Sequence, residues 1–123
     1  MKTSQVVTQV ISLAKAAKAA RAREATASNE LKTLTAEEKQ LRDFVETQPA
    51  KVIFLLTALT YLGRGDFDSK KDFLDYYADV AESFGTAKAA ERQLLAKEPL
   101  ADYLQQGLQR LHELGLDADT LAA

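Results

Sequence analysis

The chemically most distinctive residue of this 123-residue chain is Arg64, which lies between Gly63 and Gly65 where an apolar run ends. A guanidinium held on a rigid turn can bind a carboxylate or a phosphate through two parallel hydrogen bonds. Asp66 and Asp68 follow closely and offer local partners instead. The sequence leaves both interpretations open: recognition of an anionic ligand, or an ion pair that stabilises the turn.

A second group of candidate residues is a stripe of acidic side chains just after this turn. They recur at three- and four-residue spacing, which places them on one side of a helix: Asp68, Asp72, Asp75, Asp79 and Glu82. The stripe could dock a basic partner, bind Mg²⁺ or Ca²⁺, or form an ordinary solvated face. The spacing and the terminal glutamate of a calcium-binding loop are missing, and we expect no metal or other cofactor.

Basic side chains gather near the end of the first expected helix: Lys15, Lys18, Arg21 and Arg23. Such a segment could contact nucleic-acid phosphates, although no aromatic residues lie between the charges. It could also meet the acidic stripe, within the chain or across a dimer. The third interpretation is a solvated helix end.

Catalytic residue types are sparse. Cysteine is absent, which excludes a thiolate nucleophile, a disulfide and a cysteine-ligated metal. The single histidine, His112, lies beside a leucine stripe rather than in a polar cluster. Because no nucleophile or carboxylate cluster accompanies it, we expect no enzymatic activity.

Composition describes an ordinary globular chain, with 46% hydrophobic and 28% charged residues and a net charge of −2. This balance gives no global bias toward nucleic acid or an anionic membrane. The most apolar segment, residues 52–62, is about half as long as a membrane-spanning helix of roughly 20 residues. No signal-peptide pattern begins the chain, so we expect a cytoplasmic protein without a membrane partner.

The elements that position these residues are all predicted to be helices, because no alternating apolar and polar run suggests a strand. The first begins near Thr3 or Ser4, and either ends near Ala20 or projects from the core, since Arg21 interrupts its apolar stripe. Five more are predicted from Thr35, over residues 52–62, 69–84 and 86–97, and from Pro99 to about residue 114. Residues 52–62 are apolar nearly all round and should form the buried centre.

Three glycines are expected to have structural roles. Gly63 follows the last apolar residue of the central helix, so we predict a positive φ there, with Gly65 shaping the same turn. Gly107 lies inside the apolar stripe of the last long helix, where glycine costs about 1 kcal/mol of helix propensity relative to alanine. We expect another helix to approach closely at Gly107.

Two segments carry a resemblance to a known family. Residues 62–68 read Leu-Gly-Arg-Gly-Asp-Phe-Asp, and residues 99–108 read Pro-Leu-Ala-Asp-Tyr-Leu-Gln-Gln-Gly-Leu. Together they resemble domain of unknown function family 3775, a group of small bacterial and phage proteins, over roughly residues 51–114. Tyr61 stands where the family often has tryptophan, and Gln105 and Gln106 replace an acidic pair. The resemblance implies no known activity.

The sequence therefore predicts one all-α domain, a compact bundle of five or six helices. Residues 1–25 would form its amphipathic, basic first helix and residues 26–123 the remaining helical domain. The leading functional hypothesis is a non-enzymatic adaptor or regulatory module that binds a protein partner or a second copy. The alternatives are a nucleic-acid-associated protein that uses the basic helix, and a ligand-binding or enzymatic domain centred on Arg64.

Overall fold

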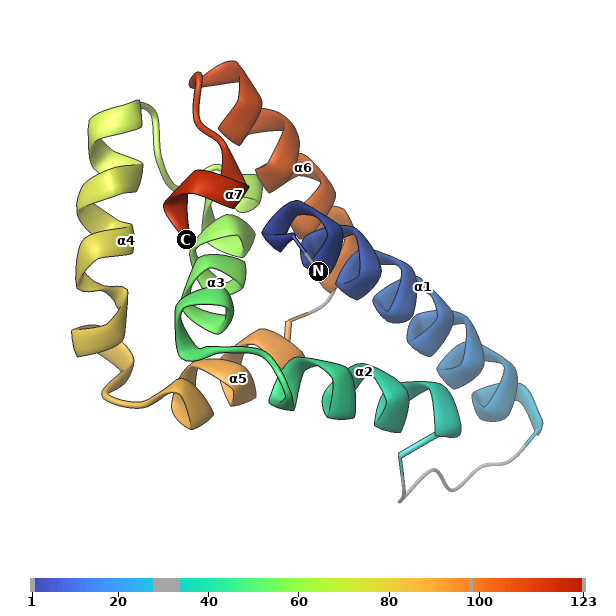
Figure 1. Ribbon diagram of the computed structural model, residues 1–123. Helices are drawn as coiled ribbons and strands as arrows, with labels where there is room; N and C mark the ends of the chain where they lie inside the picture. Colours follow the sequence, from blue (N-terminus) through green and yellow to red (C-terminus); the bar gives the residue numbers. More distant parts are fainter. Residues whose placement is uncertain (1, 28–33, 98, 123) are drawn as a thin grey trace.

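The computed structural model describes residues 2–27, 34–97 and 99–122. Within these residues every regular element is an α-helix, as the ribbon in Figure 1 shows. The helices are α1 (Thr3–Ala27), α2 (Ala36–Glu46), α3 (Ala50–Arg64), α4 (Lys70–Phe84), α5 (Ala87–Leu95), α6 (Leu100–Glu113) and α7 (Ala118–Leu121). The predicted all-α class is confirmed, and the sequence analysis missed only the four-residue α7.

The centre of the molecule is α3, as the sequence predicted. Ten of its residues are buried, from Val52 to Gly63, and it packs against α4, α5 and most extensively α6. In Figure 1, α3 lies between α4 on one side and the pair formed by α1 and α6 on the other. The two buried threonines need no tertiary partner, because Thr57 donates to the carbonyl of Ile53 (2.9 Å) and Thr60 to that of Thr57 (2.6 Å).

Several helix ends form as their sequences indicate. Thr35 and Glu38 make a reciprocal capping box at the start of α2, in which each side chain accepts from the other residue's backbone N–H. Ser69 caps α4 by accepting from the backbone N–H of Asp72 (3.1 Å). Gly85 ends α4 with a φ of 78°, in the region that glycine adopts without strain.

The prediction of a positive φ at Gly63 is wrong. Gly63 is buried inside α3, and the left-handed residue is Gly65, with a φ of 96°. The backbone N–H of Gly65 bonds to the carbonyl of Leu62, and that of Asp66 reaches back to the carbonyl of Tyr61, which closes the helix end. The helix therefore runs two residues farther than its apolar pattern suggested.

The physical reason for glycine at position 63 is the crossing of α3 with α6. A Cβ atom at Gly63 would overlap the carbonyl oxygen of Tyr103 and lie 2.7 Å from the backbone nitrogen of Gly107. One at Gly107 would overlap the carbonyl oxygen of Leu59. The close approach predicted at Gly107 is confirmed, and the two glycines let the helix backbones touch.

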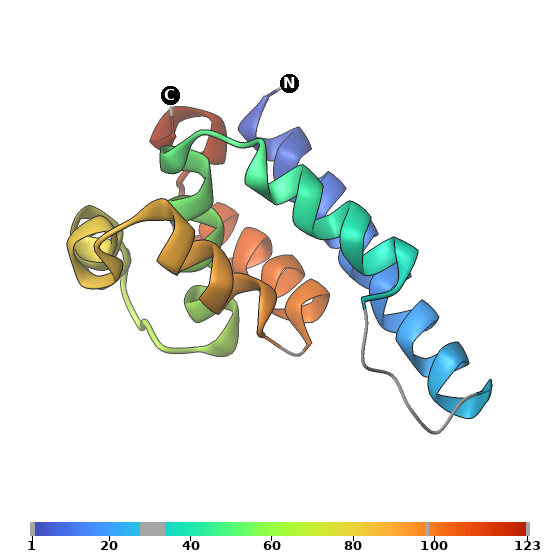
Figure 2. The same ribbon diagram turned by 90° about the horizontal axis from the view of Figure 1, so that it is seen from below.

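The first helix, α1, does not end near Ala20, but its residues in the common core end at Ala17, and Ala22 and Arg23 are exposed. It continues to Ala27, and α2 packs along it, so that the two helices run side by side in Figure 2. At the other end of α1, Asp119 accepts hydrogen bonds from the backbone N–H (2.7 Å) and the hydroxyl (3.1 Å) of Ser4. Asp119 of the short helix α7 thus caps the start of α1.

Candidate binding groove

Arg64 pairs locally. Its Nε and Nη2 atoms donate to the two carboxylate oxygens of Asp66, at 3.1 and 2.6 Å, and its guanidinium lies 4.8 Å from the ring centre of Tyr61. The hydrogen bond to Asp66 raises the pKa of Arg64, because it stabilises the protonated guanidinium. Of the two interpretations of this arginine, the ion pair within the turn matches the observed geometry.

The ring of Tyr61 joins Arg64 to a cluster that the sequence did not reveal. The Nζ atom of Lys97 lies 4.6 Å from the same ring centre and donates to the Tyr61 hydroxyl (3.2 Å). Tyr76 packs edge-on against Tyr61, and burial raises the pKa of Tyr76 to about 12. Lys97 lies 36 residues beyond Tyr61, so no local spacing could have paired them.

The acidic stripe covers the outer face of α4 and the turn before it. All five of its side chains are exposed: Asp68, Asp72, Asp75, Asp79 and Glu82. Asp75 pairs with Lys71 one turn earlier, at 2.7 Å. In the described part of the chain, no three acidic or histidine side chains converge as metal ligands do.

The basic segment divides into two parts. Arg21 pairs with Glu38 and Arg23 lies 3.9 Å from Glu37, so both meet α2. Burial raises the pKa of Glu38, but the hydrogen bonds from Arg21 and from the Thr35 backbone outweigh it and leave that pKa below its usual value. Lys15 and Lys18 are exposed.

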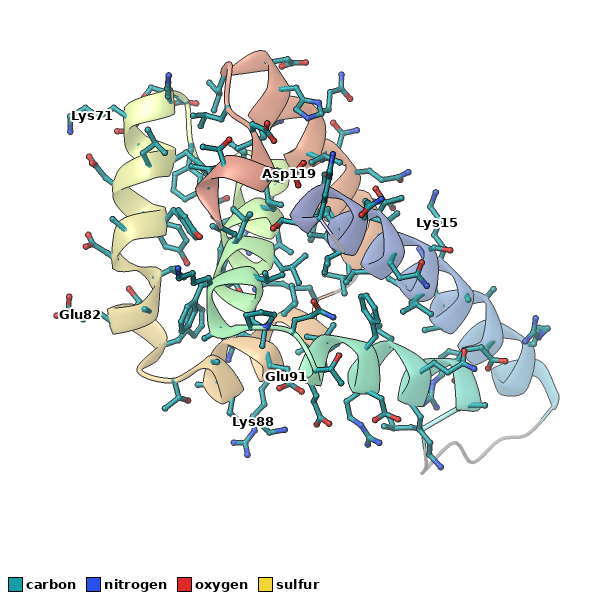
Figure 3. All side chains as sticks on the ribbon, in the orientation of Figure 1. Lys15, Lys71, Glu82, Lys88, Glu91 and Asp119 are labelled. Carbon is teal, nitrogen blue, oxygen red and sulfur yellow. The ribbon has the colours of Figure 1, made fainter. Side chains whose placement is uncertain are left out.

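The structure does not bring the basic segment and the acidic stripe together. Lys15 on α1 and Glu82 on α4, both labelled in Figure 3, project from opposite sides of the molecule. The suggestion that the two surfaces meet within one chain is therefore wrong. Arg21 and Arg23 pair with Glu38 and Glu37 of α2 instead.

An apolar hollow of about 630 Å³ lies where α1, α2 and the start of α6 meet. Its wall is built mainly from short or branched apolar side chains: Ala14, Ala17, Ala19, Ala22, Leu34, Leu41, Leu95, Leu100 and Ala101. Leu34 is 42% exposed, and it is the only large hydrophobic residue of the described chain that is exposed. Four of the described lining residues are cations: Lys15, Lys18, Arg42 and Lys97.

A second and more open hollow, of about 660 Å³, lies farther along the same two helices. Residues 8–15 of α1 and 105–112 of α6 line it, and they include Ile11, Leu108 and the exposed His112. Lys15 lines both hollows, and the lining residues recur along one side of each helix at three- and four-residue steps. We call the two hollows together the α1–α6 groove.

The α1–α6 groove is a candidate binding site because of its size and its apolar walls. Hollows of several hundred Å³ with apolar walls and a few polar groups are the usual shape of binding sites, and an amphipathic helix lays its apolar side into such a groove. The groove could not be recognised in the sequence, because its walls come from three separate segments. The one signal in the sequence was the run of alanines over residues 14–22, which offers too little side-chain volume to fill a seam between helices.

Comparison with known proteins identifies the chain at the family level. The model of a family described as "Protein of unknown function (DUF3775)" matches residues 38–112, so the chain belongs to this family. The match begins in α2, earlier than the resemblance over residues 51–114 indicated. Neither the curated proteins nor the solved structures contain a match to the chain. Among the described residues, no helix is both long and apolar enough to cross a membrane.

Proposed function

We propose that this member of the DUF3775 family is a non-enzymatic interaction module that binds a helical segment of a partner protein in the α1–α6 groove. The observation that carries the proposal is the apolar hollow beside α2, with Leu34 exposed at its edge. Apolar hollows of several hundred Å³ are the usual shape of binding sites, and Leu34 extends the apolar surface of this one. A partner helix would bury Leu34 and the alanine wall together.

A protein partner is favoured over nucleic acid by the pairing of the basic segment. Arg21 and Arg23 lie against Glu38 and Glu37 of α2, although Arg23 stays exposed, whereas Lys15 and Lys18 line the apolar hollow. Two lysines beside an apolar wall suit a helix better than a phosphate backbone, which requires several contacts and no apolar surface. Arg64 is engaged with Asp66, so we propose no ligand-binding role for it.

The test places a photo-crosslinking amino acid at Ala19, which lines the groove, and at Ala78 as a matched control on α4. Both alanines are exposed, so neither replacement should disturb folding. In the cells that naturally produce the protein, we expect a protein adduct at position 19 that is absent at position 78. The Leu34→Ser variant should weaken that adduct.

Two results would contradict the proposal. One is the same set of adducts at positions 19 and 78, which would mean that the groove has no preference over α4. The other is an adduct at position 19 that nuclease digestion removes, which would restore the nucleic-acid hypothesis.

A further inference from the structure

The two ends of the α1–α6 groove differ in charge. Around the hollow beside α2 lie Lys15, Lys18, Arg42 and Lys97. The lining of the second hollow beyond Lys15 consists of neutral polar or apolar residues together with His112. Among the described lining residues, cations therefore gather at the end beside α2.

Of the residues that the structure describes, two acidic ones also line the hollow beside α2, and each is already offset. Glu38 accepts from Arg21 and from the backbone N–H of Thr35. Asp102 lies in the first turn of α6, where the positive end of the helix dipole offsets its charge. Arg42 is likewise offset, because it pairs with Asp43 at 3.2 Å. Among the described lining residues, Lys15, Lys18 and Lys97 are therefore the cations that an incoming segment meets there.

Lys15 and Lys18 are the cations best placed to meet a partner. They are one turn apart on the exposed side of α1, and Lys15 lies at the junction of the two hollows. Figure 3 shows the Lys15 side chain projecting outward from α1. Lys97 adds a cation whose ammonium has donors left after its single bond to the Tyr61 hydroxyl.

From this asymmetry we infer that the natural occupant of the groove is an acidic amphipathic helix of a partner protein, with its carboxylates concentrated at one end. The inference rests on the proposed function and adds the chemistry of the partner. From Thr8 to Ala22, α1 rises by about 21 Å, so a partner helix of about 14 residues would fill the groove. Its apolar stripe would cover Ile11, Leu108 and Leu34, and its acidic end would lie against Lys15 and Lys18.

A second copy of this chain is a less suitable occupant, although it carries an acidic helix. The exposed residues of α4 are charged or polar except for Ala78 and Ala81. Alanine side chains cannot fill an apolar hollow of about 630 Å³, and the larger apolar residues of α4 face its own core. The acidic stripe has the required charge but lacks the required apolar face.

The test is selection from a displayed library of 14-residue helices. The apolar stripe is kept at i, i+3, i+4 and i+7 spacing, and every flanking position is varied among acidic, basic and neutral polar residues. Peptides are selected for binding to the full-length protein. Peptides that also bind the Ala19→Trp variant, in which the groove is blocked, are removed by counter-selection. We expect the enriched peptides to carry Asp or Glu at one end and neutral polar residues at the other.

The strongest selected peptide is then measured against two charge-reversal variants that carry the same net charge. Lys15→Glu with Lys18→Glu should weaken its binding by about tenfold or more. Lys70→Glu with Lys71→Glu, on α4, should leave binding within about twofold of wild type, because those lysines lie far from the groove. An equal loss of peptide affinity in both variants would overturn the inference, because the affinity would then depend on the net charge of the protein and not on the position of the lysines.

The remaining outcomes separate the acidic partner from the groove itself. Enrichment of peptides with basic or uncharged flanking residues would contradict the inference that the partner is acidic. It would still support helix binding in the groove. If no peptide is enriched on the wild-type protein relative to the Ala19→Trp variant, the groove is not a helix-binding site. Self-association of the wild type in sedimentation, abolished by the Lys15→Glu and Lys18→Glu pair, would identify a second copy as the occupant and overturn the inference.

Discussion

Two sides of α6 show opposite consequences of small residues. On the side facing α3, Gly63 and Gly107 bring the two helix backbones into contact and leave no space between them. On the side facing α1, the alanines of residues 14–22 lie beside a hollow of about 630 Å³. Small residues close an interface where the backbones can approach, and leave it open where other contacts hold the backbones apart.

What holds α1 away from α6 is visible in the distribution of large side chains. The first turns of α1 bury Val6, Val7 and Val10 in the common core. Farther along, α1 packs against α2 and its arginines pair with α2 glutamates. The second half of α1 is therefore positioned by α2 rather than by α6, and the seam with α6 stays unfilled.

The largest effect is expected where the backbones touch. Gly63→Ala should prevent folding or lower the free energy of unfolding by more than about 3 kcal/mol, because the added Cβ overlaps a backbone carbonyl that cannot rotate away. This exceeds the cost of about 1 kcal/mol expected for left-handed strain alone. Urea denaturation followed by circular dichroism measures the loss.

The control for this prediction enlarges a small residue on the open side. Ala19→Leu adds more atoms than Gly63→Ala, yet it lines the hollow and should change the free energy of unfolding by no more than about 0.5 kcal/mol. Similar losses in the two variants would mean that the closed and open sides of α6 are not distinct.

A matched pair of leucines on α6 sharpens the same contrast. Leu104 is fully buried in the common core, so Leu104→Ala should cost about 2–5 kcal/mol. Leu108 is partly exposed and lines the second hollow, so Leu108→Ala should cost about 1 kcal/mol or less. Thermal unfolding of the two variants gives the comparison directly, and a larger loss for Leu108 would reverse our assignment of the two sides.

The cap between α7 and α1 should make stability depend on pH. Hydrogen bonding from the Ser4 backbone lowers the pKa of Asp119, so the carboxylate favours folding above its unfolded pKa of about 4. That stability is lost as the pH falls through the lower pKa of the folded state. Asp119→Asn should therefore reduce Tm at neutral pH and reduce the drop in Tm between pH 5 and pH 2. If Tm of the variant falls between pH 5 and pH 2 as much as that of the wild type, Asp119 does not stabilise the fold through this cap.

The smallest effect is expected at the residue that is most prominent in the sequence. Arg64 pairs with Asp66 at the surface, where its side chain is 43% exposed, so Arg64→Ala should cost less than about 1 kcal/mol. Adduct formation at position 19 should be unchanged. A loss of that adduct with normal stability would show that Arg64 recognises the partner.

Much of the fold could be predicted from local pattern. The caps at Thr35 and Ser69 and the apolar circumference of the central helix are local signals, and the structure confirms them. Even Gly107 could be interpreted correctly, because a glycine inside an apolar helix stripe weakens the helix unless a neighbouring backbone needs the space. Gly63 could not, because a glycine after an apolar run is consistent both with a helix end and with a helix crossing.

The α1–α6 groove could be predicted from the sequence much less well than the fold. The groove depends on where α1 lies relative to α6, and the ion pair between Arg21 and Glu38 that helps to fix α1 against α2 spans 17 residues. The conspicuous charges at Arg64 and along α4 were easier to notice than the absence of large side chains over residues 14–22. An unfilled seam is a property of the assembled helices and leaves only an indirect trace in the sequence.

The most direct test of the binding surface is an amide chemical-shift titration of the ¹⁵N-labelled protein with the acidic helical peptide selected above. We predict that the perturbed amides lie on residues 8–22 of α1 and 102–112 of α6, together with Leu34, while residues 70–83 of α4 remain unchanged. Perturbations centred on α4, or spread evenly over the surface, would contradict the central claim that the α1–α6 groove is the binding surface of this protein.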